Sequence, residues 1–173
     1  MTENKESSVV IVAAGRGERA GQEGGPKQYR LIGGAPVLRH TVLAFLTTGL
    51  FRRIVIVIHK DDHVLATEAL SGLGDTISLV TGGPTRQAST LLGLQSLSGN
   101  PPTNVLIHDG VRPFVDADLL KRVLDGLDGG HGVIPALAVS DTLKRATDFV
   151  IDGTVDRQGL YGAQTPQAFP FGA

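Results

Sequence analysis

The sequence predicts an α/β sandwich, in which helices cover both faces of a mainly parallel β-sheet. Short runs rich in valine and isoleucine recur along the chain, and segments with helical spacing lie between them. The apolar runs are mostly continuous rather than alternating with polar residues, which is typical of strands buried on both faces. Strand and helix alternate four times. The economical arrangement of such an order is a parallel sheet with crossover helices.

Each expected element has its own local signal. The apolar runs predict strands at 9–12, 54–58, 77–80, 105–107 and 133–139. Helical spacing predicts helices at 36–47, 62–70, 85–97 and 116–127. Pro36 stands at a helix-entry position, and Asp116 is expected to cap its helix through a carboxylate oxygen.

The alternation of strand and helix ends after Ala138. Asp152-Gly153 predicts a hairpin turn between strands at 142–150 and 154–160. These strands are too polar to form a core of their own. We therefore expect a β-arm at about 140–161 that packs on another surface, such as a second subunit.

Composition limits the classes of function. A length of 173 residues suits one domain, and a net charge of −1 gives no broad electrostatic case for binding nucleic acid or membrane. The chain has no cysteine, which excludes disulfides and thiolate metal sites. Its apolar runs are far shorter than the ~18 residues that a membrane helix needs, and the first eight residues carry no signal-peptide core. These features predict a soluble cytoplasmic protein.

A glycine-rich loop, AAGRGERAGQEGGPKQY at 13–29, follows the first expected strand. A plain turn, a dinucleotide site and a triphosphate site are the alternatives. A dinucleotide site needs an acidic residue ~20 residues on, and a P-loop needs G-K-[ST]; the sequence has neither at the required place. Glycine N–H groups approach phosphate closely, and Arg19 and Lys27 can neutralise its charge, although either cation alone could be solvated surface.

Two further constellations follow expected strands. Asp109 can hold Mg²⁺ against substrate phosphates, or it can simply cap a turn. Arg112, three residues on, can pair with an acid or bind phosphate. Gly82 and the Ser89 hydroxyl can receive a base or a sugar, and an ordinary helix entry explains them equally well.

Thr142, Arg157 and Thr165 lie in or next to the expected arm. Threonine hydroxyls and arginine suit a phosphorylated alcohol, while ordinary hairpin chemistry is the alternative. The histidines at 40, 59, 63 and 131 have no metal-ligand spacing.

Together these residues form an ordered series of motifs: AAGxGxR…PKQY, GGxxRxxS, HDGVRP, DTLKR, VDRxGL and QTPQAF. From residue 9 to about 169 the series resembles the 2-C-methyl-D-erythritol 4-phosphate cytidylyltransferase family. The resemblance implies a Rossmann-like three-layer α/β/α nucleotidyltransferase sandwich with a protruding β-arm, and a homodimer that exchanges arms. It also implies transfer of CMP from CTP to methylerythritol phosphate, with Mg²⁺ as cofactor, in non-mevalonate isoprenoid biosynthesis.

The resemblance assigns roles residue by residue. Arg19 and Lys27 are expected to stabilise the α-phosphate transition state, and Asp109 to face Mg²⁺. The residues expected to hold CTP are Ala13, Ala14, Gly15, Gly82 and Ser89. Those expected around methylerythritol phosphate are Arg112, Thr142, Arg157 and Thr165. The partner's arm is expected to supply Thr142 and Arg157.

The sequence departs from the family pattern at three places. The loop between Gly17 and Lys27 is one residue longer, and residues 83–85 replace the more usual acidic residues. The family also carries a further carboxyl-terminal region with a second acidic metal contact, a threonine and a lysine. We therefore expect residues 1–173 to form one domain that lacks its carboxyl-terminal part, so turnover by these residues alone is not assured. A truncated sequence and the front part of a longer, bifunctional polypeptide are both open explanations.

Three other functions are alternatives to this one: a different cytidylyltransferase, a non-catalytic binding protein and an oxidoreductase. A ribitol-5-phosphate cytidylyltransferase shares the loop and QTPQ motifs, but DTLKR and VDRxGL favour the erythritol enzyme. A non-catalytic nucleotide-binding fragment would bind CTP without turnover. An NAD-type oxidoreductase is disfavoured, because the acidic residue for the ribose is missing.

Overall fold

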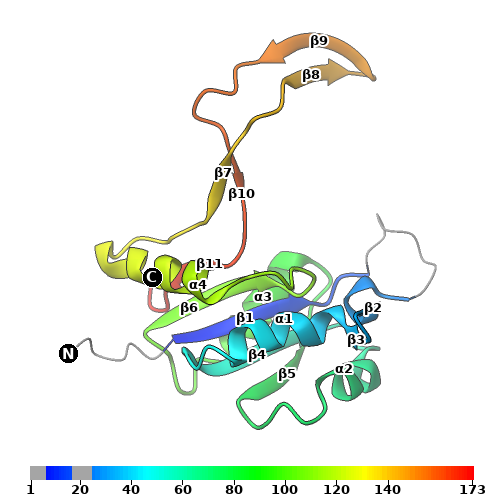
Figure 1. Ribbon diagram of the computed structural model, residues 1–173, viewed down its shortest axis with the longest axis vertical. Coiled ribbons are helices and arrows are strands. Elements are labelled where there is room, and N and C mark those ends of the chain that lie inside the picture. The colour runs from blue at the N-terminus through cyan, green and yellow to red at the C-terminus, as the bar shows by residue number, and fades with distance from the viewer. Residues whose placement is uncertain (1–6, 17–24) are drawn as a thin grey trace.

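The computed structural model describes residues 7–16 and 25–173, so the predicted residue Arg19 lies outside the described residues. Its main sheet has five strands: β1 (Ser7–Ala13), β4 (Phe51–Ile58), β5 (Ile77–Thr81), β6 (Asn104–Asp109) and β11 (Gln167–Pro170). Their order is β11-β6-β1-β4-β5, and all neighbours are parallel except β11 and β6 (Figure 1). The prediction of a mostly parallel sheet is therefore confirmed.

Helices cover both faces of this sheet. The helices are α1 (Val37–Leu46), α2 (His63–Leu70), α3 (Arg86–Gln95) and α4 (Ala117–Asp125). Val9 and Ile11 pack in one core cluster with residues of α1, α2 and α4, whereas Val10 packs on the opposite face, the face of α3. Successive side chains of a strand point to opposite faces, so this division means that both faces of the sheet are buried. The predicted three-layer sandwich is confirmed.

Outside the arm, the described residues form four further short elements, three of them between residues 27 and 36 and one directly after α4. They are a 3-10 turn, η2 (Lys27–Tyr29), a small ribbon of β2 (Leu31–Ile32) and β3 (Ala35–Pro36), and a second 3-10 turn, η3 (Gly126–Gly129). Among the described residues, no helix has the length and apolar character to cross a membrane.

The starts of the helices follow their local signals, with one exception. Asp116 Oδ1 accepts a hydrogen bond from the Leu119 backbone N–H at 2.7 Å, which confirms the predicted cap of α4. Pro36 directly precedes α1. Asp62 precedes α2 but makes no capping bond: its Oδ1 pairs with Arg16 Nη1 at 2.8 Å, and its buried Oδ2 has no hydrogen-bond partner among the described residues.

The β-arm rises from the sandwich as two successive ribbons (Figure 1). The first ribbon pairs β7 (Ala136–Ala138) with β10 (Tyr161–Ala163), and the second pairs β8 (Leu143–Thr147) with β9 (Val150–Val155). The prediction of a buried strand at 133–139 is wrong, since β7 is exposed and pairs outside the main sheet. Its place as the final strand of the main sheet is taken by β11.

The predicted hairpin turn at Asp152-Gly153 is also wrong. The turn lies at Asp148 and Phe149, whose φ angles of 48° and 63° suit a two-residue turn between paired strands. Gly153 instead pairs with Arg145, next to a register shift in the ladder. A glycine inside a strand often marks such an irregularity. Asp152-Gly153 resembles the sequence of a hairpin turn, but its glycine belongs to the register shift within the ladder.

Candidate functional site

The site lies at the carboxyl ends of the parallel strands. The chain passes from β1 to β4 and β5 on one side, and then crosses to β6 on the other side of β1. In open α/β sheets, ligands bind in the crevice that such a reversal creates at the carboxyl ends. A cavity of about 740 Å³ lies there. The predicted residues that line it are Ala14, Gly15, Lys27, Ser89, Asp109 and Arg112.

A buried amide fixes the start of the glycine-rich loop. Gln28 is 1% exposed, and its Nε2 donates to the carbonyl oxygens of Ala13 at 2.7 Å and Gly15 at 3.2 Å. Ala13, predicted to hold CTP, is buried and does not line the cavity. Sequence reasoning missed Gln28, although it stands next to Lys27 in the PKQY motif.

The turn at Gly82 and Gly83 lies at the side of the cavity next to α3, where Gly83 lines the cavity and Gly82, predicted to hold CTP, does not. A β-carbon on Gly82 would stand 2.7 Å from both the Ala14 Cβ and the Ser89 Oγ, so only glycine fits there. The Ser89 hydroxyl donates to the Gly83 carbonyl oxygen at 3.2 Å and accepts from the Gly83 N–H at 3.1 Å. Its polar contacts within the chain therefore hold this turn.

Arg16 contributes a cation to the same cavity, but its guanidinium is paired. Nη1 lies 2.8 Å from Asp62 Oδ1, and Nη2 lies 3.1 Å from Asp61 Oδ2. Asp62 is 2% exposed, so this pair ties the end of β1 to the loop after β4. Lys27, by contrast, is an exposed cation of the cavity wall.

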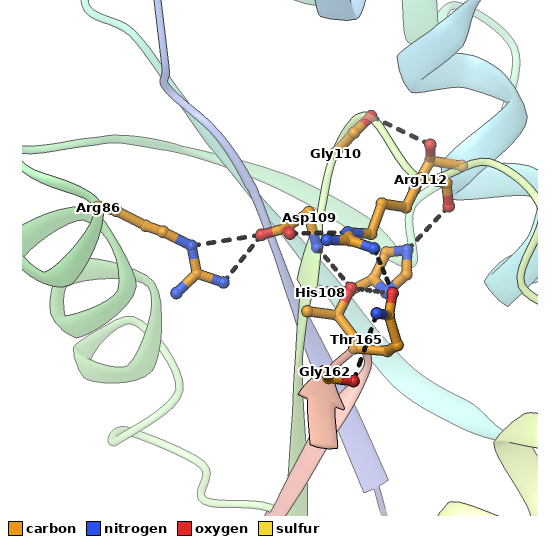
Figure 2. A network of polar contacts seen from close by, with 9 residues as sticks. Arg86, His108, Asp109, Gly110, Arg112, Gly162 and Thr165 are labelled. Carbon is orange, nitrogen blue, oxygen red and sulfur yellow. Dashed lines mark hydrogen bonds and ion pairs between the residues drawn. The ribbon is translucent and has the colours of Figure 1, made fainter. Parts of the chain in front are cut away.

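Two guanidinium groups hold the Asp109 carboxylate (Figure 2). Arg86 Nη2 lies 2.8 Å from Oδ1, and Arg112 Nε lies 2.9 Å from Oδ2. Burial raises the pKa of Asp109, but the hydrogen bonds and charges of Arg86 and Arg112 outweigh it and leave the pKa below its ordinary value. Arg86 is a site residue that sequence reasoning missed, although the GGxxRxxS motif contains it.

Arg112 joins the first cavity to a second one of about 730 Å³, since it lines both. Its Nη1 donates to Gln164 Oε1 at 2.7 Å. Gln164 and the predicted residue Thr165 line the second cavity together with apolar side chains of the loop before α4 and the base of the arm. Gln164 was not predicted, and its place in QTPQAF is the signal that could have identified it.

His108 forms the floor beneath Thr165. The imidazole is fully buried, and it meets the Phe45 ring edge-on at a centroid distance of 4.9 Å. Nε2 lies 2.9 Å from the Arg112 carbonyl oxygen, and Nδ1 lies 3.0 Å from Thr165 Oγ1. Burial lowers the pKa of His108 to about 4, against the opposing effect of the hydrogen bond to the Arg112 carbonyl.

The arm residues lie apart from both cavities within one chain. Neither Thr142 nor Arg157 lines them, and Arg157 Nη1 donates to the Ser140 carbonyl oxygen within the arm itself. The structure thus groups Arg112 and Thr165 but does not bring Thr142 and Arg157 to them.

The described residues contain no cluster of three or more His, Asp or Glu side chains that could hold a metal ion by themselves. Asp109 supplies one carboxylate at the edge of the first cavity. Mg²⁺ typically uses one or two carboxylates and takes further oxygens from substrate phosphates and water. The donor set therefore fits Mg²⁺ where a bound triphosphate completes the coordination, and it does not fit a metal site built from protein alone.

Comparison with solved structures agrees with this architecture. The chain superposes on 4-diphosphocytidyl-2C-methyl-D-erythritol synthase from Anaerococcus prevotii with a TM-score of 0.81 and 33% identity, covering 98% of this chain and 73% of that one. The corresponding cytidylyltransferase from Thermus thermophilus gives a TM-score of 0.75 and 30% identity, over 96% and 71% of the two chains.

Comparison of sequences points the same way. The bifunctional enzyme IspD/IspF of Brucella anthropi is 60% identical over 166 residues, which are 95% of this chain and 41% of that protein. The chain thus spans about two fifths of the length of the curated relatives that it matches. A family model described as IspD, 2-C-methyl-D-erythritol 4-phosphate cytidylyltransferase, matches residues 7–173. The chain belongs to the 2-C-methyl-D-erythritol 4-phosphate cytidylyltransferase family.

Proposed function

We propose that this chain transfers CMP from CTP to 2-C-methyl-D-erythritol 4-phosphate, giving the CDP-alcohol and pyrophosphate for non-mevalonate isoprenoid biosynthesis. The observation that carries the proposal is the position of Arg112 between two cavities of similar volume. The cavity with the glycine-rich loop and Lys27 suits a triphosphate, and the cavity with Thr165 suits a phosphorylated alcohol. A reaction that consumes CTP requires a compartment that supplies nucleoside triphosphates, so we also propose a cytoplasmic location.

In the proposed reaction, an oxygen of the 4-phosphate attacks the α-phosphorus of CTP in line. A new P–O bond forms, the bond between the α-phosphorus and the bridging oxygen breaks, and pyrophosphate leaves with its electron pair. A phosphate monoester is already anionic at neutral pH, so no general base is required. Positioning and charge neutralisation by Lys27, Arg112 and the glycine-loop N–H groups then supply the acceleration.

We further propose that Asp109 contacts Mg²⁺ when CTP is bound. The ion would neutralise charge on the triphosphate as a Lewis acid. Because both Asp109 oxygens are paired with guanidinium groups, at least one of these pairs must lengthen or share its oxygen. Arg86 and Arg112 otherwise keep the carboxylate ionised and directed toward the cavity edge.

A pyrophosphate-release assay tests the proposed function. The complete polypeptide that the reading frame encodes is supplied with CTP and Mg²⁺, and with either methylerythritol phosphate or ribitol 5-phosphate. We expect turnover with methylerythritol phosphate and a kcat/KM for ribitol 5-phosphate lower by about 10² or more, because mispaired hydroxyls in a polar site are costly. Preference for ribitol 5-phosphate would favour the rival function, and binding of CTP by calorimetry without turnover would favour a non-catalytic fragment.

We also propose that two copies of the chain form a dimer by exchanging β-arms. Large apolar side chains stand exposed on the arm: Leu137, Phe149, Val150, Ile151 and Tyr161. Phe149 at the tip is fully exposed, and an apolar surface of this kind favours burial against a partner. Exchange would also carry Thr142 and Arg157 to the second cavity of the other copy.

Exchange of arms predicts rescue between two inactive variants. Lys27→Ala and Arg157→Ala each remove one component of a shared site, so each homodimer should be nearly inactive. After co-refolding at equal amounts, random pairing should restore about a quarter of the wild-type turnover, because half the dimers have one intact site. Simple mixing of two Arg157→Ala preparations is the control. No recovery in verified mixed dimers would show that each site is built from a single chain.

A further inference from the structure

The hydrogen bonds around His108 have a definite direction. The Arg112 carbonyl oxygen can only accept, so Nε2 of His108 must carry the hydrogen that joins them at 2.9 Å. The imidazole is fully buried and packs on the Phe45 ring, which disfavours a second, charging proton. Nδ1 is therefore a bare acceptor, and Thr165 Oγ1, at 3.0 Å, must donate its hydroxyl hydrogen to it.

This donation decides what Thr165 can still do. A threonine hydroxyl has one hydrogen to donate and two lone pairs that accept. The hydrogen goes to His108, and one lone pair receives the Asp109 backbone N–H at 3.4 Å (Figure 2). One acceptor position remains on an oxygen whose residue lines the second cavity.

We propose that His108 is a positioning residue that turns Thr165 into a hydrogen-bond acceptor, so that Thr165 recognises a hydroxyl group of the second substrate and not its phosphate. The inference rests on the proposed function of the second cavity. A phosphate oxygen at neutral pH also accepts, so it would meet the remaining Thr165 lone pair unfavourably. Arg112, whose guanidinium only donates, lines the same cavity and is left to receive the phosphate.

The tautomer of His108 tests the first step without any assay of turnover. A long-range ¹H–¹⁵N spectrum of the wild-type protein should show a neutral ring with hydrogen on Nε2 and none on Nδ1. A ring with hydrogen on Nδ1 would overturn the inference. The spectrum reports the position of the hydrogen on His108 even if the proposed reaction is not observed.

Two substitutions separate the two hydrogen bonds of His108. Asparagine can place an amide oxygen near the Nδ1 position and keep an acceptor for Thr165. Glutamine reaches toward the Nε2 position and can donate to the Arg112 carbonyl, but it leaves Thr165 free to rotate. His108→Gln should raise the KM for methylerythritol phosphate about tenfold, and more than His108→Asn does, while kcat changes less.

The control pair is His63→Asn and His63→Gln, on an exposed residue at the start of α2 that lines neither cavity. Both should leave KM at the wild-type value. Equal increases in KM for the two His108 variants, or no increase for His108→Gln, would overturn the positioning role. If either His108 variant fails to fold, the positioning role is tested by the tautomer of the wild-type protein and by the kinetics of Thr165→Val.

Thr165→Val separates recognition of hydroxyl from recognition of phosphate. The KM for methylerythritol phosphate should rise about tenfold, whereas the inhibition constant of inorganic phosphate, used as a competitor, should change by less than about twofold. A parallel loss of phosphate affinity would mean that Thr165 donates to phosphate, which contradicts the inference. Wild-type protein that releases no pyrophosphate at all would instead contradict the proposed function.

Discussion

Replacing Lys27 with alanine is expected to lower kcat by about 10²- to 10³-fold, the usual effect of removing one preorganised group that stabilises developing charge. Lys27 begins the turn η2 and lines the cavity at the carboxyl ends of the strands. The neighbouring cation Arg16 is paired with Asp61 and Asp62, so it cannot readily replace the missing charge. The effect should fall on kcat more than on the KM for CTP, because the charge of the α-phosphate region grows as the reaction proceeds.

The fold should survive this change, since the Lys27 side chain is exposed. Thermal unfolding of the variant should match the wild type. Lys121→Ala is the matched control, because Lys121 is an exposed lysine on α4 that lines neither cavity. Turnover of Lys27→Ala close to that of Lys121→Ala would remove Lys27 from the proposed mechanism.

Asp109→Asn should cause the second large loss, a fall in kcat/KM of about 10²- to 10³-fold. The substitution keeps the shape of the side chain but removes the charge that holds Arg86 and Arg112 on opposite sides. Arg112 then loses the ion pair with Asp109, one of two side-chain contacts that hold it between the two cavities, and keeps the hydrogen bond to Gln164. The proposed contact with Mg²⁺ is weakened as well, because a neutral amide oxygen is a poorer ligand for a hard cation.

Steady-state kinetics at several Mg²⁺ concentrations can separate these two consequences. If Asp109 contacts the metal, the variant should need more Mg²⁺ for half-maximal rate. If the carboxylate only orients the two arginines, the Mg²⁺ dependence should match the wild type while the KM for methylerythritol phosphate rises. Asp75→Asn, at an exposed loop position, controls for the general effect of removing a carboxylate. A kcat/KM within about threefold of the control would contradict both roles.

Local signals were sufficient for most of the sandwich. The apolar run at 9–12 lies within β1, the run at 54–58 lies within β4, and the Asp116 cap begins α4 as expected. These elements depend on burial of their own side chains or on hydrogen bonds within four residues. The sequence-based prediction was wrong for the run at 133–139, because the choice of partner strand decides which segment joins the main sheet. Val133 makes only an isolated bridge to Ala168, while β11 takes the edge of the sheet next to β6.

The site shows the same division. Glycines, cations and a carboxylate near expected strand ends identified Gly15, Lys27, Arg112 and Asp109, which do line one cavity. The partners that orient them were missed, because their roles depend on contacts across the fold. Gln28 reaches the carbonyl oxygens of Ala13 and Gly15 from η2, 13 or more residues further along the chain. Arg86 reaches Asp109, at the end of β6, from the start of α3.

The sequence by itself determined the α/β architecture, the family and the chemical types of side chain at the carboxyl ends of the strands. Buried apolar runs and motif order carry that information along the chain. Only the tertiary structure decided the direction of the hydrogen bond between His108 and Thr165, which are 57 residues apart, and the clamping of Asp109 between two arginines. A side chain's protonation and its donor or acceptor role depend on burial and on neighbours, and folding alone brings those neighbours together.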